Sequence, residues 1–278
     1  MALMALCVKL VSDTVPLGQI VFFRSAFALL PLIIFLYARR EFPSGLATKR
    51  PGGHLLRSIV GATGMFTSFA AIARLPVADA TLINYVAPLL TALFGGLLLG
   101  ETVTRSRVTG IVLGMIGVLA LTLPEFSATD VDTVRLAGYG FGLLGALFSS
   151  LAMIQVRRLG TTESPGAIAL YFVVICMLIS LPTAGGWVTP TGREYTILIL
   201  AGFLGGFAHI ALTLAYRYAE VSLLAPFEFL TLLWAGAIDV LILRLSLSPY
   251  FFVALPFLLA GATVSSGLLG RMRRRRKS

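Results

Sequence analysis

Charged side chains are scarce in this sequence of 278 residues. Asp, Glu, Lys and Arg make up only 12% of it, whereas apolar types make up 58% and the mean hydropathy is +0.94. Soluble domains carry about 25% charged residues, so too few charges remain here to cover a water-exposed surface. A disordered chain would need far fewer apolar residues. The composition therefore predicts a polytopic membrane protein, in which spans of about 20 residues leave no room for a soluble catalytic domain.

Cysteine and histidine are also rare, with two residues of each kind. Cys7 and Cys176 lie in apolar runs without metal-binding neighbours, so we interpret both as small hydrophobic residues. The sequence has no H-E-x-x-H, G-x-S-x-G or P-loop motif, and 140–145 matches G-x-G-x-x-G only inside an apolar run, where glycines serve helix packing. We therefore expect no metal, no cofactor and no enzymatic activity.

Long apolar runs recur along the chain, separated by short polar breaks. Lipid offers no partner for a backbone amide, so these runs must be helices or strands of a closed barrel, and they lack the alternation of barrel strands. We predict an all-α polytopic protein with ten transmembrane helices, near Ala2–Val11, Leu17–Ala38, Leu55–Ala73, Ala80–Leu99, Val108–Leu123, Leu136–Val156, Ala167–Leu181, Tyr195–Ala215, Leu223–Leu243 and Tyr250–Leu269.

The first of these spans is short. The 12 residues before Asp13 would form roughly 18 Å of helix against a hydrocarbon core of about 30 Å. Either this helix is a partial span or the natural chain begins before Met1. A cleaved signal peptide is disfavoured, because no basic residue precedes the apolar run.

The distribution of Lys and Arg predicts the orientation. With both termini in the cytoplasm, 15 of these residues fall inside and 4 outside, and the bias persists at 9 against 4 without the C-terminal tail. The tail, 271–278, follows the last span directly, so we expect it to contact anionic lipid headgroups rather than nucleic acid. We predict a multi-pass protein of the inner (plasma) membrane.

The chain also shows signs of an internal duplication. Sliding it by 144 residues lays Gly61–Glu101 over Gly205–Leu245, with Val77 on Val221 and Asn84 on Glu228. Five helices per copy is an odd number, so the second copy must enter the membrane upside down. The division predicted is 1–130, 131–270 and the basic tail 271–278. Inverted repeats are typical of secondary transporters, whose substrate site lies near the midplane between the repeats.

Two segments carry a family resemblance. AAIARLPVADATLINYVAPLLTALFGGLLLGE (70–101) and AYRYAEVSLLAPFEFLTLLWAGAIDV (215–240) resemble the fourth- and ninth-helix signatures of EamA-type proteins of the drug/metabolite transporter (DMT) superfamily. The resemblance covers the whole chain as a 5+5 arrangement and is greatest to the YddG-type amino-acid exporters. It implies a transporter of amino acids or similar metabolites. One departure is that Arg244 and Leu245 stand where the family has an acidic residue matching Glu101.

Ionisable residues inside spans are costly and mark candidate sites. They are Lys9, Arg24, His209, Glu228 and Asp239. Two helix faces add polar groups at i, i+3, i+4, i+7 spacing, one through Thr81 and Asn84 and one through His209 and Thr213. Nearby prolines at 88 and 226 free backbone carbonyls. The predicted cavity residues are Lys9, Thr81, Asn84, Tyr85, His209, Thr213, Tyr216 and Glu228.

Plainer roles stay open for several of these residues. Glu228 could pair with Lys9 or Arg24, His209 could be a packing residue, and Lys9 could bind a substrate carboxylate or form a structural ion pair. Asp239 is expected at the outer interface, paired with Arg244.

The sequence as a whole predicts a monomeric secondary transporter that exports an amino acid or a related metabolite by alternating access, with proton coupling through Glu228 or His209 as a hypothesis. Its expected partners are the small-molecule substrate and the lipid bilayer. Import of another metabolite stays open. So do two other classes, a non-transporting membrane scaffold and an intramembrane enzyme, although the latter would need a nucleophile or metal set that the spans lack.

Overall fold

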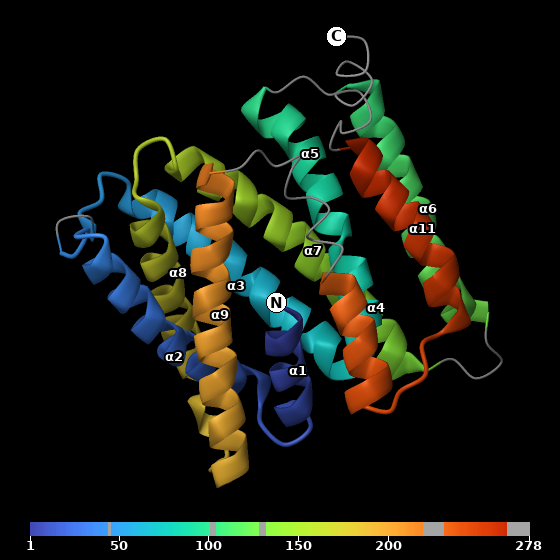
Figure 1. Cartoon of the computed structure of the whole chain (residues 1–278), viewed down its shortest axis with the longest axis horizontal. Helices are drawn as coiled ribbons and strands as arrows, with labels where there is room; N and C mark the ends of the chain where they lie inside the picture. Colours follow the sequence, from blue (N-terminus) through green and yellow to red (C-terminus); the bar gives the residue numbers. More distant parts are fainter. Residues whose placement is uncertain (44–45, 101–103, 128–131, 219–230, 266–278) are drawn as a thin grey trace.

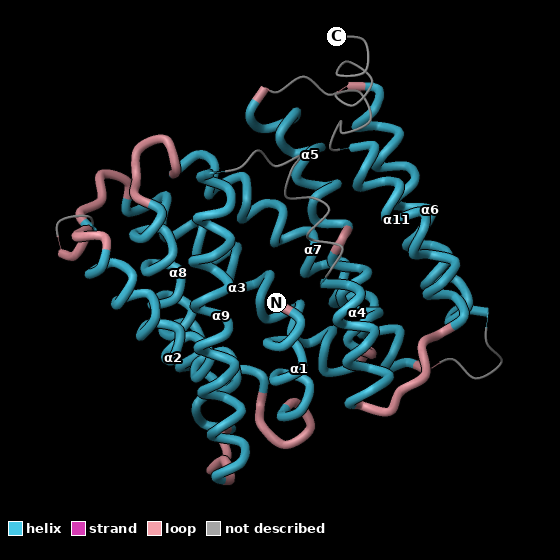
Figure 2. Tube along the Cα trace, viewed as in Figure 1, coloured by secondary structure: helices cyan, strands magenta, loops and turns pink. Residues whose placement is uncertain are grey.

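The computed structural model describes residues 1–43, 46–100, 104–127, 132–218 and 231–265, and for residues 92, 107, 124–127, 212–218, 262 and 265 it describes the backbone alone. The described residues form helices joined by turns, with no strand among them (Figure 2). The helices are α1 (Ala2–Val11), α2 (Leu17–Ala38), α3 (Pro51–Arg74), α4 (Val77–Asn84), α5 (Val86–Leu99), α6 (Arg105–Ser127), α7 (Thr133–Leu159), α8 (Pro165–Ser180), the 3-10 helix η2 (Leu181–Gly186), α9 (Gly192–Tyr218), Thr231–Ile242 with its last turn η3 (Ile238–Ile242), and α11 (Pro249–Ser265). The prediction of an all-α protein is confirmed.

Each of the ten predicted spans overlaps an apolar helix within the residues that the structure describes. Among these residues, six helices are long and apolar enough to cross a membrane, counting α4 with α5 and α8 with η2, and four apolar helices are shorter, at 10–17 residues. The short ones include α1, which spans 10 residues. The count of ten spans and their inverted arrangement therefore stay predictions.

The helices pack in two groups that share a central contact. On one side α2 packs against α8 and α9, and α1 packs against α9. On the other side α6 packs against α11, and α5 packs against α7 (Figure 1). An extensive contact between α3 and α7 joins the two groups. Each group therefore combines helices from the first half of the chain with helices from the second half.

Local sequence signals explain where several helices begin. Asp132 accepts hydrogen bonds from the amides of Val134 and Arg135 at the start of α7, and Ser164 accepts one from Ala167 at the start of α8. These are the preferred N-cap residues, because a short polar side chain can satisfy amides that have no partner within the helix. Helix α4 is different, since Pro76 precedes it and provides no side-chain cap.

The outer surface of the bundle is apolar. Leu97, Trp234 and Leu241 are 68%, 64% and 72% exposed, and many other large apolar side chains share this exposure. Such a surface exceeds what a soluble monomer tolerates, and it suits contact with lipid. Together with the long apolar helices, it agrees with a multi-pass membrane protein.

Candidate functional site

A cluster of charged side chains surrounds the turn between α3 and α4. Lys9, near the end of α1, reaches this turn and donates hydrogen bonds to the carbonyl oxygens of Ala73 and Leu75, both at 3.0 Å. These carbonyls lie at the C-terminal end of α3, where the helix dipole favours a positive charge. Lys9 therefore caps α3.

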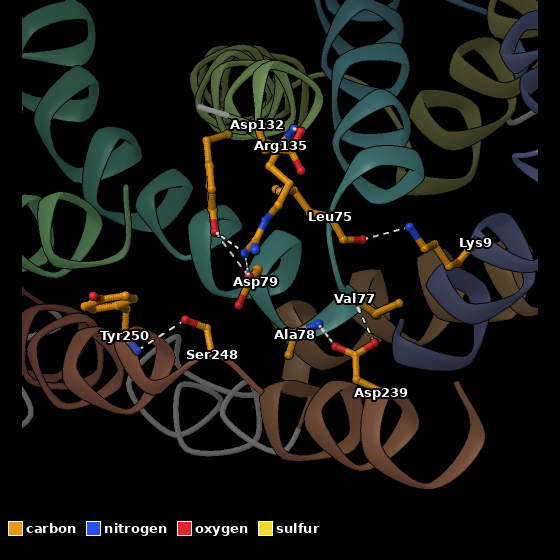
Figure 3. Close-up of polar contacts among 11 residues, drawn as sticks. Lys9, Leu75, Val77, Ala78, Asp79, Asp132, Arg135, Asp239, Ser248 and Tyr250 are labelled. Atoms are coloured by element: carbon orange, nitrogen blue, oxygen red, sulfur yellow. Dashed lines mark hydrogen bonds and ion pairs between the residues drawn. The ribbon is translucent and has the colours of Figure 1, made fainter. Parts of the chain in front are cut away.

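Asp239 lies on the other side of the same turn. Its carboxylate accepts hydrogen bonds from the amides of Val77 at 3.0 Å and Ala78 at 2.6 Å, and the residue is fully buried (Figure 3). These amides are the first two of α4, which has no cap of its own. A carboxylate at a helix N-terminus is stabilised by the free N–H groups and by the dipole. Both carboxylate oxygens are thus used on α4, and no ion pair between Asp239 and Arg244 forms among the described residues.

A second buried carboxylate, Asp79, joins α4 to α7. Asp79 is 1% exposed and lies 3.6 Å from the Arg135 guanidinium, and the Tyr139 hydroxyl donates a hydrogen bond to it at 3.2 Å. Arg135 also donates a hydrogen bond to the Tyr139 hydroxyl at 3.3 Å. Lys9, Asp79, Arg135, Tyr139 and Asp239, here named the α3–α4 polar cluster, connect α1, α4, α7 and the helix over Thr231–Ile242 at one end of the bundle.

Two arginines form a second and very different cluster among α2, α3, α8 and α9. Arg24 is 2% exposed, and among the described residues its guanidinium donates hydrogen bonds to two thioether sulfurs, those of Met65 at 3.3 Å and Met4 at 3.9 Å. Thioether sulfur is a weak acceptor. The buried Nε of Arg24 has no hydrogen-bond partner among the described residues.

Arg57 enters the same region from α3. Its guanidinium carbon lies 3.8 Å from the centre of the Phe172 ring, a cation–π contact with α8. The buried Nε and Nη1 atoms of Arg57 have no hydrogen-bond partner in the part of the chain that the structure describes. Each such cation inside a membrane costs at least about 2.5–3.5 kcal/mol.

Glycines on α3 and α9 allow the two guanidiniums to lie against helix backbone. A Cβ atom at Gly205 would lie 2.9 Å from Arg24 Nε, and one at Gly61 would lie 2.6 Å from Arg57 Nη1. Any larger residue would push the guanidinium away. The absence of side chains at these two positions is what makes room for the charges.

Cys176 and His209 complete this arginine cluster, which we define as Arg24, Arg57, Cys176 and His209. The groups of Cys176 and His209 each lie within electrostatic range of both arginines. The His209 ring also meets the edge of Phe172, with 5.9 Å between ring centres. His209 thus lies near two arginines, and its predicted role as a cavity residue stays a prediction.

The other predicted cavity residues lie in several places. Thr81 is half-buried and Asn84 is exposed, whereas Tyr85 is buried in the apolar core. Thr213 and Tyr216 belong to α9, but their side chains lie outside the description, and Glu228 lies outside the described residues altogether. Lys9 lies in the α3–α4 polar cluster, so the structure does not bring these eight residues together. Their role in binding stays a prediction.

A helix break marks the position of Tyr85. Helix α4 ends at Asn84 and α5 begins at Val86. Pro88 has no N–H to donate to the carbonyl of Asn84, four residues earlier, and a proline inside a helix commonly bends or breaks it. The break agrees with the expected release of backbone carbonyls near this proline.

A buried contact between a histidine and a glutamate lies at the start of α3, where α7 ends and α8 begins. His54 Nε2 is 3.4 Å from Glu163 Oε2, with both side chains 2% exposed. Glu163 also accepts a hydrogen bond from the Lys49 amide at 3.2 Å. Burial by itself would raise the pKa of Glu163, but the contacts with His54, Lys49 and Thr48 outweigh it and hold the pKa below its ordinary value. These contacts link the segment before α3 to the loop between α7 and α8.

Sequence reasoning missed Arg57, Asp79, Arg135 and Tyr139. Arg57 lies near the start of α3, which begins at Pro51, four residues before the predicted span over Leu55–Ala73. Proline at a first helical position was the signal that could have extended this helix. Nothing in the sequence indicates that Asp79 and Arg135 lie close together.

Comparisons with known proteins place these clusters in context. A model of the EamA-like transporter family matches residues 1–123. The pseudopaline exporter CntI of Pseudomonas aeruginosa is 31% identical over 228 residues, covering 80% of this chain and 76% of the exporter. An S-adenosylmethionine uptake transporter of Rickettsia prowazekii is 26% identical over 212 residues, covering 76% of this chain and 68% of that protein.

Similarity extends to solved structures. A crystal structure that is 21% identical in sequence superposes with a TM-score of 0.69 and covers 98% of this chain and 96% of its own. At this identity the match supports the fold alone.

Among the described residues, no group of three His, Cys, Asp or Glu side chains could hold a metal ion.

Proposed function

This chain belongs to the EamA-like transporter family, and on that premise we propose that it exports an amino acid or a similar small metabolite by alternating access. Its relatives are named transporters, so it is a transporter of small metabolites and not an enzyme. These relationships do not determine the direction of transport, the class of cargo or the mechanism. We propose export, an amino acid or similar metabolite, and alternating access.

The observation that carries the proposal is the way the α3–α4 polar cluster joins helices from the two halves of the chain at one end. Asp79 and Arg135 hold α4 against α7, and Asp239 holds α4 against the helix over Thr231–Ile242. In alternating access one end of the bundle closes while the other opens, so contacts at the closed end must form and break in each cycle. Charged contacts suit this role, because water can replace each partner when the end opens.

Lys and Arg counts support the orientation of this proposal. The excess of positive charge in the loops and tail predicts that both termini face the cytoplasm and that the α3–α4 polar cluster faces outward, across the inner membrane. Export is the proposed direction, in keeping with the CntI relative and the resemblance to amino-acid exporters. The Rickettsia relative is named for uptake, so direction must be tested directly.

Counterflow in proteoliposomes tests the proposal. Vesicles containing the purified protein are preloaded with an unlabelled compound, and entry of the same radiolabelled compound is followed for a panel of neutral, anionic and cationic amino acids and S-adenosylmethionine. We expect at least one compound to accumulate above the level in protein-free vesicles. If a preparation with a cooperative melting transition accumulates none of them, the assigned cargo is wrong. Flux measured in vesicles of known protein orientation then decides between export and import.

A further inference from the structure

We propose that Arg24 and Arg57 form a binding site for an anionic cargo, whose carboxylate groups outnumber its amino groups. The inference deepens the proposed function and rests on it. The guanidiniums of Arg24 and Arg57 carry a permanent positive charge, because a guanidinium stays protonated at any physiological pH. The arginine cluster therefore carries two fixed positive charges among α2, α3, α8 and α9.

The buried carboxylates among the described residues all have partners in the protein, which sets the two arginines apart. Asp239 accepts two amide hydrogen bonds, Asp79 faces Arg135, and Glu163 faces His54. No described carboxylate faces Arg24 or Arg57, and among the described residues the buried Nε of Arg24 and the buried Nε and Nη1 of Arg57 lack acceptors. Buried charges are normally neutralised by a partner or a ligand, since an unpaired one is strongly destabilising.

The donor geometry fits a carboxylate. A guanidinium offers N–H groups in a planar fork that can hold both oxygens of one carboxylate. Arg24 directs two of its nitrogens toward thioethers and leaves Nε without a partner, and Arg57 leaves Nε and Nη1 without partners. Two carboxylates could thus each meet a guanidinium, with the exchange of water for charged hydrogen bonds providing the affinity.

The walls of the cluster suit the rest of an organic molecule. Met4 and Met65 border Arg24, and Phe172 lies against both Arg57 and His209. Thioethers and aromatic rings adapt to apolar surfaces of varied shape. The site combines two anion-binding groups with an apolar lining, as expected for a small organic anion.

The net charge distinguishes this inference from binding of an ordinary amino acid. A zwitterion would bring one positive and one negative charge, so the two guanidinium charges would stay uncompensated. A dianion would neutralise them. We therefore expect selectivity for dicarboxylates over their neutral amides.

Thermal stabilisation tests the site without measuring transport. The melting temperature of the purified full-length protein is measured with glutarate, with the neutral analogue glutaramide, and with sodium chloride at matched ionic strength. A ligand at about ten times its Kd is expected to raise the melting temperature by about 2–5 °C. We expect this rise with glutarate alone, and equal melting temperatures in the three solutions would overturn the proposal.

Two variants locate the effect. Arg24→Gln and Arg57→Gln should each lose the glutarate shift, whereas Arg193→Gln, which removes an exposed charge at the start of α9, should keep it. If both interior variants keep the full shift, glutarate binds elsewhere and the site is wrong.

A substitution that adds charge keeps the test decisive if the glutamine variants fold poorly. Cys176 lies within electrostatic range of both guanidiniums, so Cys176→Asp places a carboxylate within reach of their charges, and Cys176→Asn provides a neutral control of similar size. The Asp variant should melt higher than the Asn variant without ligand and should not respond to glutarate. An Asp variant that melts at or below the Asn variant and still responds would contradict the proposal.

Failure of this inference and failure of the proposed function have different signatures. Glutarate stabilisation that depends on Arg24, with no counterflow of any compound, would support the anion site and contradict the transport assignment. Counterflow of neutral metabolites by a protein that glutarate does not stabilise would support transport and contradict the anion site.

Discussion

The Asp239 carboxylate accepts a hydrogen bond from the Val77 amide at 3.0 Å, across a separation of 162 residues. A residue in the second half of the chain thereby provides the N-cap of a helix in the first half. Lys9 caps the end of α3 on the other side of the same turn. A carboxylate and an ammonium group thus hold one short connection, each on the side that the helix dipoles favour.

Removing this cap should weaken the fold. Asp239→Ala leaves the buried amides of Val77 and Ala78 without an acceptor, and we expect a loss of about 2–4 kcal/mol in the free energy of unfolding. The matched control is Asp132→Ala, because Asp132 also caps two amides but is exposed. Its loss should be smaller, about 0.5–2 kcal/mol. Unfolding in mixed micelles measures both losses. Equal losses would show that the buried cap stabilises the fold no more than the exposed one.

The contact between Asp79 and Arg135 should show coupling in a double-mutant cycle. Arg135→Gln leaves a buried carboxylate without its cation. Because the Arg135 side chain is 34% exposed, we expect a loss of about 1–3 kcal/mol, below that of a fully buried pair.

The second substitution in this cycle is Asp79→Asn, and the cycle is closed by the double variant. Removing both charges should cost less than the sum of the single changes, by about 1 kcal/mol. Additive losses would mean that the contact between Asp79 and Arg135 contributes nothing to the free energy of unfolding. The same unfolding measurement serves for all four proteins.

The contacts of Glu163 predict a dependence of stability on pH. Burial opposes ionisation of this carboxyl group, but its contacts with His54, Lys49 and Thr48 prevail and its pKa lies below the ordinary value. A carboxyl group whose pKa is lower in the folded state stabilises the fold above its unfolded pKa of about 4.3, and this contribution is lost as the pH falls through the folded value.

The variant that tests this dependence is Glu163→Gln. It should melt below the unchanged protein at pH 7, and the difference should shrink as the pH drops below about 4. Melting temperatures over this range provide the measurement. A difference that stays constant with pH would show that ionised Glu163 does not contribute.

Pro88 should keep the break between α4 and α5 open. Pro88→Ala restores an N–H that can bond the carbonyl of Asn84, so we expect a gain of about 1 kcal/mol and a melting temperature higher by about 2–4 °C. A straightened helix should also slow counterflow. Pro256→Ala is the control, since Pro256 is another exposed proline inside a helix but α11 is continuous around it. Equal effects of both substitutions on flux would contradict a role for the break.

The apolar pattern located the helices well. Runs such as Leu17–Ala38 match their helices to the residue, because a chain in lipid must satisfy its backbone within each span. The family could likewise be recognised from two short segments. The predicted span over Leu55–Ala73 starts four residues after α3, which begins at Pro51.

The sequence by itself determined that this chain is a helical membrane protein, because hydropathy and charge counts depend on local composition, and the resemblance of two segments to EamA-type proteins predicted a transporter. It also singled out Lys9, Arg24, His209 and Asp239, because an ionisable residue in an apolar run is visible without coordinates. Their partners were decided only by tertiary structure. Asp239 contacts α4 rather than Arg244, and Arg24 shares its surroundings with Arg57, because these contacts depend on how helices distant in sequence cross. That packing decides which charged side chain caps a helix, as Asp239 does, and which has donors without a partner among the described residues, as Arg24 does.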